Sequence, residues 1–233
     1  MKKITIAIDG HSSTGKSTAA KQLAKKLNYI YVDTGAMYRA VSYFVLQNRL
    51  IENGQVKENE LTDHLEDIKI RFENNPDSKN ADVYLNNVNI EKEIRTLEVS
   101  NIVSRVAEIS AVRKKLVQQQ QAMGVEKGIV MDGRDIGSVV FPDAELKVFM
   151  TAAPEVRATR RYDELIERGD DITFDEVLKN VLERDRIDSS REDSPLIQTE
   201  DALLLDTSKM SREAQLEQLE QWARERIPDG SEQ

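Results

Sequence analysis

The chain has 233 residues, of which 39% are hydrophobic and 32% charged, a composition that describes an ordinary globular protein with one substantial core. The net charge of −9 argues against a nucleic-acid partner, because a polyanion is bound by a basic surface. The sequence lacks cysteine, a signal peptide and any apolar run near the ~20 residues that cross a bilayer, so we expect a cytoplasmic protein without disulfides, thiolate metal sites or membrane contact.

Five short apolar runs predict buried strands, and amphipathic helical patterns separate them. The runs cover residues 4–8, 29–32, 129–131, 146–150 and 203–205. Apolar residues recur at helical spacing after the first two runs, before the third and at the end of the chain. This alternation predicts an α/β fold in which helices cover both faces of a five-stranded parallel sheet, a three-layer α/β/α architecture.

One segment follows a different period. From Ile68 to Phe72, and again from Val83 to Ile90, apolar residues alternate with polar ones. The stretches 74–77 and 86–87 carry the asparagine and proline that are typical of turns. We therefore predict a small antiparallel sheet inserted into the α/β core. The tail, residues 228–233, is expected to be frayed.

A glycine-bounded loop follows the first predicted strand and precedes a helical stripe. It comprises Gly10, His11, Ser12, Ser13, Thr14, Gly15, Lys16, Ser17 and Thr18. A strand, loop and helix in this order are typical of a phosphate-binding loop, in which backbone N–H groups and the helix N-terminus face the anion. The pattern predicts that Lys16 neutralises the β- and γ-phosphates of a nucleotide and that the Ser17 hydroxyl ligates Mg²⁺.

A polar cluster follows the second predicted strand, where the carboxyl ends of parallel strands form ligand sites. It spans residues 33–39 and places Tyr38 and Arg39 where a second substrate could bind. The alternative is that Asp33 or Thr34 caps the next helix and that Arg39 is solvated.

A second polar cluster, residues 132–137, follows the third predicted strand. Its first residue, Asp132, comes directly after an apolar run, as expected of an acid that holds Mg²⁺-bound water. The alternative is a turn closed by a local Asp–Arg pair. Farther upstream, Ser104 and Arg113 lie in and just after the helix that follows the insertion, and each alone is typical of a surface residue.

Arginines dominate the segment from 157 to 191, in which Lys179 is the only lysine. They are Arg157, Arg160, Arg161, Arg168, Arg184, Arg186 and Arg191. Their helical spacing places Arg157 with Arg161 on one face, and Arg184 with Asp188 and Arg191 on another. Many acidic residues lie nearby, so a solvated ion-pair surface is one interpretation. The choice of arginine over lysine favours the other interpretation, bidentate binding of phosphate.

No Ser/His/Asp arrangement and no metal-ligand spacing is present, and neither histidine suggests a catalytic role. A kinase that acts on a hydroxyl usually needs a carboxylate base, whereas an acceptor that is already a phosphate dianion needs none. Catalysis then consists of aligning two anions and neutralising their charge. A loop lysine, Mg²⁺ and several arginines suit that reaction.

Together these motifs closely resemble the bacterial-type cytidylate (CMP) kinases, within the nucleoside monophosphate kinase superfamily. The resemblance runs from Ile4 to about Trp222, and its most specific stretches are residues 33–39, 93–99, 132–143 and 184–188. It implies conversion of CMP, and of dCMP, to the diphosphate with MgATP as donor. It also implies a P-loop kinase domain that acts as a monomer.

The resemblance further implies how the chain is organised. The single kinase domain would have a core at about 1–34, 113–154 and 172–227. A nucleoside monophosphate-binding lobe would span about 35–112, with its β insertion at about 66–92. A helical lid would lie at about 155–171.

Site roles also follow from the resemblance. Ser104, Arg113 and Asp135 would read the cytosine ring, and Asp188 would touch the sugar hydroxyl. Arg39, Arg134, Arg184 and Arg191 would hold the acceptor phosphate, with Thr34, Tyr38 and Gly133 in the same substrate site. Arg157, Arg160 and Arg161 would close over ATP, and the expected catalytic set is Lys16, Arg134, Arg157, Arg161 and Arg184.

Other functions remain as alternatives. A kinase for UMP, AMP or a small hydroxyl substrate is the nearest, and turnover of each would distinguish them. A nucleotide-switch GTPase would need an Asn-Lys-x-Asp motif, and a transporter-type ATPase a Leu-Ser-Gly-Gly motif, and the sequence contains neither. An inactive regulatory module is the remaining alternative, although every expected charged position is filled.

Overall fold

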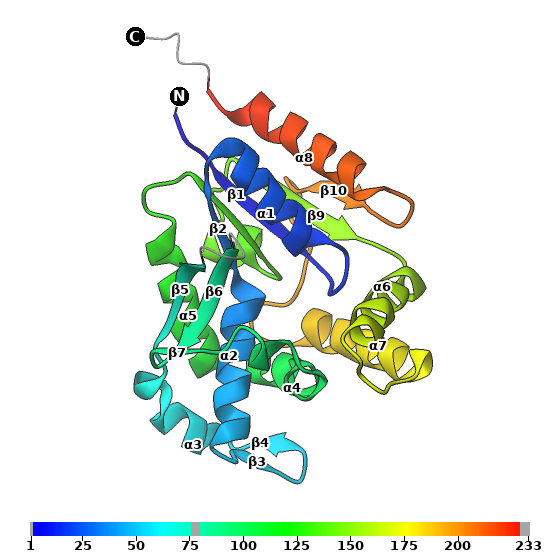
Figure 1. Cartoon of the computed structure of the whole chain (residues 1–233). Helices are drawn as coiled ribbons and strands as arrows, with labels where there is room; N and C mark the ends of the chain where they lie inside the picture. The colour runs from blue at the N-terminus through cyan, green and yellow to red at the C-terminus, as the bar shows by residue number, and fades with distance from the viewer. Residues whose placement is uncertain (1, 76–79, 229–233) are drawn as a thin grey trace. The chain divides into compact units, whose positions relative to one another are not determined.

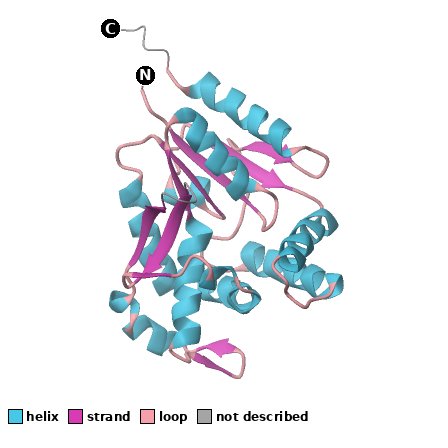
Figure 2. Cartoon of the chain, viewed as in Figure 1, coloured by secondary structure: helices cyan, strands magenta, loops and turns pink. Residues whose placement is uncertain are grey.

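The computed structural model describes residues 2–75 and 80–228 (Figures 1 and 2). The chain divides into two compact units, one formed by residues up to Asp33 together with those from Gln120 onward, the other by Thr34–Gln119. Most of the tail expected to be frayed, and part of the turn expected at 74–77, lie outside the described residues. The core, lobe and lid boundaries expected from the resemblance stay a prediction.

The first unit is built on a five-stranded sheet with strand order β10-β9-β1-β8-β2. Its strands are β1 (Thr5–Gly10), β2 (Ile30–Asp33), β8 (Ile129–Gly133), β9 (Leu146–Thr151) and β10 (Leu203–Asp206). Every pair is parallel, as the alternation of strands and helices predicts. Each predicted apolar run is confirmed as a strand that ends one or two residues later than predicted, because hydrogen bonding continues into residues that apolar patterning does not mark.

Two helices cover one face of this sheet (Figure 1). They are α1 (Lys16–Leu27) and α8 (Arg212–Arg226), and both carry small residues, among them Ala20 and Ala223, into the core. On the other face, the π-helical turn η3 (Ile136–Val140) packs against β1 and β8. The helical layer that the sequence predicts on this second face stays a prediction.

A helix pair follows β9. It consists of α6 (Pro154–Glu167) and α7 (Phe174–Ser190), which form a small core of their own around Ala158, Leu165 and Val181. A proline at the first position of α6 suits a helix start, since its missing N–H would have no intrahelical partner. Thr173 and Glu176 form a reciprocal capping box at the start of α7. These local signals fix where each helix of the pair begins.

Gly10 ends β1 in a conformation that other residues adopt poorly, with φ +147°. A Cβ on Gly10 would lie 2.0 Å from the backbone oxygen of Met150 in the neighbouring β9. A backbone atom cannot move aside as a side-chain end can. We therefore expect Gly10→Ala to destabilise the protein by ~3 kcal/mol, measured by urea unfolding. The matched control is Gly169→Ala, where a Cβ meets no atom within 4 Å and only the positive φ is strained. Equal losses in both variants would contradict this account.

The second unit starts with α2 (Thr34–Gln47) and contains two small antiparallel sheets. The predicted insertion is confirmed as a sheet of β5 (Ile70–Asn75), β6 (Asn80–Leu85) and β7 (Val88–Asn89). The turn between β6 and β7 consists of Asn86 and Asn87, both with positive φ, which is the geometry of a tight hairpin turn. Its remaining helices are α3 (Glu58–Asp63), η1 (Leu65–Asp67), η2 (Glu93–Arg95), α4 (Leu97–Glu108) and most of α5 (Ser110–Met123).

A second hairpin was not predicted. It pairs β3 (Ile51–Glu52) with β4 (Gln55–Val56) through Asn53 and Gly54, whose φ values are 51° and 76°. An Asn-Gly pair is the strongest short signal for such a turn. The signal was present, but two-residue strands are too short to show an alternating pattern.

Candidate active site

The phosphate-binding loop predicted from the sequence lies between the end of β1 and the start of α1. Ser13 and Gly15 have positive φ, and α1 begins directly after Gly15. Inside the loop, the Thr14 hydroxyl donates to the backbone oxygen of His11 at 3.1 Å. The loop is thus folded around the helix N-terminus, where backbone N–H groups and the helix dipole favour an anion.

Lys16 is buried within this loop, and its Nζ donates to the backbone oxygen of His11 at 2.9 Å. Burial, followed by the charge of nearby Arg134, lowers the pKa of Lys16 to about 7, although Asp132 and Asp33 oppose the shift. Burial is the larger cause of this shift, and the charges of Arg134 and Arg184 add to it. A phosphate dianion bound here would favour the protonated lysine.

Asp132, the fourth residue of β8, accepts two hydroxyl hydrogen bonds. Ser17 Oγ donates to its Oδ2 at 2.8 Å, and Tyr31 Oη donates to its Oδ1 at 2.8 Å. Burial and the neighbouring carboxylate of Asp33 raise the pKa of Asp132. Two carboxylates and two hydroxyls are thus gathered at the carboxyl end of two adjacent strands, where a cation would relieve the crowding of negative charge.

This donor set fits Mg²⁺, which prefers oxygen ligands and binds proteins through one or two carboxylates together with substrate phosphates. A site with so few protein ligands differs from a dedicated metal cage. Among the described residues, no group of three or more histidine, cysteine or acidic side chains could hold a metal ion alone.

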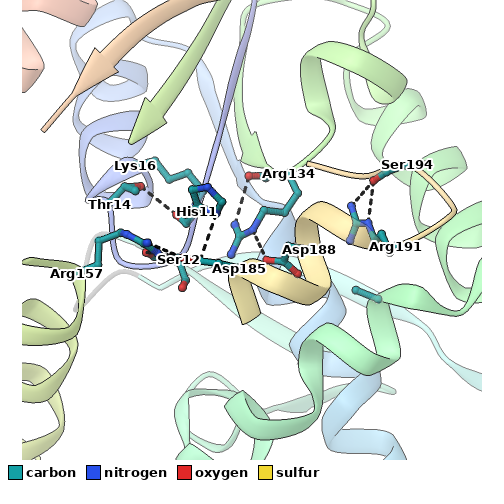
Figure 3. A network of polar contacts seen from close by, with 12 residues as sticks. His11, Ser12, Thr14, Lys16, Arg134, Arg157, Asp185, Asp188, Arg191 and Ser194 are labelled. Carbon is teal, nitrogen blue, oxygen red and sulfur yellow. Dashed lines mark hydrogen bonds and ion pairs between the residues drawn. The ribbon is translucent and has the colours of Figure 1, made fainter. Parts of the chain in front are cut away.

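Arg134 forms an ion pair with Asp188 of α7, with Nε 2.7 Å from Oδ2 (Figure 3). The alternative of a local Asp–Arg pair closing the turn at 132–137 is wrong in this respect, because the partner of Arg134 lies 54 positions away. Burial would raise the pKa of Asp188, but Arg134, Arg184 and Arg191 outweigh it and lower that pKa. Helix α7 thus brings Asp188 to Arg134, the residue that follows β8.

Arg191 lies just beyond α7, where its Nε and Nη2 donate to the backbone oxygen of Ser194 at 2.8 and 2.6 Å. The predicted face of Arg184, Asp188 and Arg191 is therefore present on one helix and its C-cap. The charge of Arg184 lowers the pKa of both Lys16 and Asp188. Four of the predicted phosphate-binding cations, Lys16 included, belong to one charge cluster in the first unit.

A buried carboxylate links the phosphate loop to the turn that carries Asp135. Asp9, directly before Gly10, accepts from the backbone N–H groups of Ile136 at 2.8 Å and Gly137 at 2.7 Å. Burial raises the pKa of Asp9 to about 7, despite the opposing effect of these hydrogen bonds. Asp9 therefore fixes the backbone next to Asp135, which is itself buried.

The arginines of α6 differ in what they contact. Arg157 donates to the backbone oxygen of Ser12 and to Asp185, and Arg160 donates to the backbone oxygen of Thr14 at 3.1 Å. Arg161, in contrast, pairs with Glu164 of its own helix at 3.3 Å. Two of the three predicted lid arginines thus lie against the phosphate loop.

Two further arginines fit the solvated ion-pair interpretation. Arg168 pairs with Glu164 at 3.8 Å, and Arg186 pairs with Glu183 at 2.8 Å; both arginines are exposed. The resemblance gave these two side chains no role in the site, and their surface ion pairs agree with the solvated interpretation.

In the second unit, Arg113 and Ser104 are buried, so the interpretation of each as a surface residue is wrong. Arg113 is 2% exposed, donates to the backbone oxygen of Ala107 at 3.1 Å, and places its guanidinium 5.6 Å from the ring centre of Tyr38. Thr34 is buried at the start of α2, and Arg39 is half-buried on the same helix. A buried guanidinium beside an aromatic ring is suited to bind a ligand that carries hydrogen-bond acceptors.

Sequence reasoning missed several site residues. It gave no role to Asp9, Tyr31 or Asp185, which hold the Asp135 turn, Asp132 and Arg157 respectively. Asp9 and Tyr31 each lie in a strand next to a recognised motif, which is the one signal that could have found them. Nothing in the sequence distinguishes Asp185 from the acidic residues around it.

Comparisons with known proteins agree with this arrangement. The family model described as cytidylate kinase matches residues 6–225. The cytidylate kinase of Flavobacterium johnsoniae is 61% identical over 215 residues, covering 92% of this chain and 94% of the relative. That of Parabacteroides distasonis is 59% identical over 215 residues, with 92% and 94% covered. That of Porphyromonas gingivalis is 52% identical over 227 residues, with 97% and 96% covered.

Among solved structures, an uncharacterised protein from Eubacterium ventriosum superposes with a TM-score of 0.52 at 11% identity, covering 97% of this chain and 100% of the other. At that identity the likeness concerns the fold alone. Within the described part of the chain, none of the helices has the length and apolar character needed to span a membrane.

Proposed function

The chain belongs to the cytidylate kinase family and so acts as a nucleoside monophosphate phosphotransferase; we propose that the charge cluster around Lys16 is where the γ-phosphoryl group of ATP passes to CMP, and to dCMP. The single observation that carries this proposal is the gathering of cationic side chains around the buried Lys16 of the phosphate loop. Lys16, Arg134 and Arg184 interact electrostatically there, in a protein whose net charge is −9. Such a cluster is stable when anions occupy it.

The donor nucleotide is proposed to bind along the loop from Gly10 to Thr18. Backbone N–H groups and Lys16 would hold its β- and γ-phosphates, and Arg157 and Arg160 lie against the same loop. Ser17 would ligate Mg²⁺ directly and Asp132 would hold it through water, since the oxygen donors there suit that ion. Bound Mg²⁺ would screen the charge of the β- and γ-phosphates. Arg161 is the least supported member of the set because it pairs with Glu164.

The acceptor nucleotide is proposed to bind through arginines and other polar side chains. Arg39, Arg134, Arg184 and Arg191 would hold its phosphate, and Asp188 its sugar hydroxyl. Ser104, Arg113 and Asp135 would read the cytosine ring. Thr34, Tyr38 and Gly133 would also contact this substrate. Cytosine has an amine donor and a ring acceptor where uracil has the reverse, so fixed carboxylate and guanidinium groups would leave uracil with unpaired polar groups.

No general base is required in this proposal. The acceptor oxygen is already an anionic phosphate oxygen, so the residues need only align the two nucleotides and reduce their repulsion. Lys16, Arg134, Arg157, Arg161 and Arg184 would supply the positive charge, and their preorganisation at the loop is the catalytic device. Water exclusion by the helices α6 and α7 would strengthen these charges. We further propose a monomer located in the cytoplasm, which gel filtration and cell fractionation would test.

A coupled ADP-release assay with the common nucleoside monophosphates tests the proposed reaction. We expect kcat/KM for CMP to exceed the values for UMP and AMP by at least about tenfold. A base with a different pattern of donors and acceptors would leave buried polar groups of the protein unpaired. Shikimate serves as the control for a small hydroxyl acceptor. Equal turnover of UMP and CMP would count against the proposed reading of cytosine, and turnover of shikimate against the reaction class.

Asp135→Ala should reduce the preference for CMP over UMP more than it reduces ATP binding. The proposed reason is that a buried carboxylate beside the base rewards the cytosine amine and repels the uracil carbonyl. We expect the ratio of kcat/KM for CMP to that for UMP to fall about tenfold or more, with KM for ATP within about twofold of wild type.

A matched control for this variant is Asp143→Ala. Asp143 is exposed and lies ten residues after Gly133, the last residue of β8. We expect the control to keep the wild-type ratio, since its side chain is solvated. An unchanged CMP/UMP ratio in Asp135→Ala would remove Asp135 from the base-reading set.

A further inference from the structure

Three segments of the first unit meet at Asp185, which sequence reasoning assigned no role (Figure 3). His11 and Ser12 belong to the phosphate loop, Arg157 to α6 and Asp185 to α7. Arg157 and Asp185 join the two helices, while His11 and Ser12 place the loop against both. We refer to His11, Arg157 and Asp185 as the loop bridge.

Arg157 is held from three directions. Its Nε donates to the backbone oxygen of Ala152 at 2.9 Å, and its Nη1 donates to that of Ser12 at 3.4 Å. Asp185 accepts from Nη1 at 2.8 Å and from Nη2 at 2.5 Å, a bidentate pair. A bidentate pair fixes the plane of the guanidinium as well as its position. Arg157 is 2% exposed, so this orientation is built into the fold.

His11 completes the loop bridge from the side of the phosphate loop. Its Nδ1 lies 3.2 Å from Asp185 Oδ1, the same oxygen that accepts from Arg157. The contact does not have hydrogen-bond alignment, and Nδ1 is buried without another partner. The His11 ring is nearly perpendicular to the ring of Phe149 in β9, with an interplanar angle of 84° and ring centres 6.3 Å apart. The imidazole is therefore confined beside the carboxylate.

The electrostatics of Asp185 agree with this geometry. Burial alone would raise its pKa, but the neighbouring His11 and Arg157 outweigh burial and lower the pKa to about 2. The carboxylate is thus ionised at neutral pH. In the same loop, Ser13 adopts a positive φ, which most residues other than glycine avoid.

We propose that Asp185 is a positioning residue for the donor nucleotide, which sets the affinity for ATP by fixing Arg157 and the His11–Ser12 half of the phosphate loop. The inference rests on the proposed function in placing ATP on this loop. Asp185 stands directly after Arg184, and Asp188 lies one turn further along α7. The same helix thus serves the two substrates with different residues: Asp185 acts on the donor, whereas Arg184 and Asp188 act on the acceptor.

The test is a double-mutant cycle of Asp185→Asn and His11→Gln in the full chain. Isothermal titration calorimetry with the non-hydrolysable analogue AMP-PNP and Mg²⁺ gives donor affinity, and steady-state kinetics give KM for CMP. We expect Asp185→Asn to weaken AMP-PNP binding about tenfold and His11→Gln about threefold, with KM for CMP within about twofold. The double variant should bind as Asp185→Asn does, because both changes break one bridge.

Glu183→Gln is the matched control, since Glu183 lies on α7 and forms an exposed ion pair with Arg186. We expect its affinity for AMP-PNP to equal that of wild type. The inference is overturned if Asp185→Asn binds AMP-PNP within twofold of wild type, if KM for CMP changes as much as donor affinity, or if the two single effects multiply in the double variant.

Folding is monitored by the thermal midpoint Tm of each variant. Should Asp185→Asn not fold, His11→Gln decides alone: a threefold loss of affinity supports the bridge, and an unchanged affinity overturns it. Donor binding is measured without an acceptor, so the two proposals are tested separately. A wild-type enzyme that does not phosphorylate CMP would contradict the proposed reaction. The role of the loop bridge would still be decided by the binding of AMP-PNP.

Discussion

Lys16→Ala is expected to lower kcat by about three orders of magnitude while leaving the fold intact. The lysine is the buried cation of the phosphate loop, and removing one preorganised charge from a phosphoryl-transfer site costs several kcal/mol of transition-state stabilisation. Burial and Arg134 lower the pKa of Lys16 to about 7, so its charged form is disfavoured in the ligand-free protein. We therefore expect the Tm of the variant to equal or exceed that of wild type.

Lys26→Ala provides the control for this prediction. Lys26 lies in the last turn of the same helix, α1, and its partner is Glu220 at the surface. We expect the control to retain kcat within about twofold, because an exposed ion pair contributes little. A Lys16→Ala enzyme with near-normal kcat, or one whose loss of activity is matched by loss of structure, would refute the assigned role.

Asp188→Asn is expected to destabilise the protein by ~3 kcal/mol and to raise KM for CMP. Asp188 is 4% exposed and forms a close ion pair with Arg134, so the substitution leaves a largely buried guanidinium without its carboxylate. Nearby arginines lower the pKa of Asp188, and the stability that it supplies is therefore complete above the ordinary aspartate value of 3.8 and is lost as the pH falls further. Urea unfolding at several pH values measures both effects.

Glu220→Gln is the comparison for Asp188→Asn, because Glu220 pairs with Arg224 and Lys26 at the surface. We expect a loss of less than about 1 kcal/mol there. If Asp188→Asn were as stable as wild type at pH 7, or if its deficit grew rather than shrank below pH 4, the buried pair would not have the assigned role.

The sheet and the phosphate loop could be predicted because their signals are local. Five apolar runs are confirmed as five parallel strands, and the period-two segment is confirmed as the sheet of β5, β6 and β7. Apolar patterning marks what is buried, and glycine marks where the backbone must turn. The apolar pattern and the glycine positions were thus sufficient to predict the strands of the parallel sheet and the phosphate loop.

The polar contacts could not be predicted, because they join residues far apart in sequence. Helical spacing placed Asp188 beside Arg184 and Arg191 but did not indicate its partner Arg134, and Asp185, the partner of Arg157, does not differ by pattern from its acidic neighbours. Ser104 and Arg113, each taken alone, were interpreted as surface residues, yet both are buried. Which carboxylate of a charged helix faces inward depends on the packing of α6 with α7, and sequence spacing alone does not determine it.

The most direct measurement is a crystal structure with CMP and a non-hydrolysable ATP analogue bound together. The account predicts an acceptor phosphate oxygen about 3–3.5 Å from the γ-phosphorus of the analogue, with the nitrogens of Lys16 and Arg134 within hydrogen-bonding distance of the two phosphates. Both ligands bound, but with the acceptor phosphate more than about 6 Å from that phosphorus and out of reach of the arginines, would contradict it.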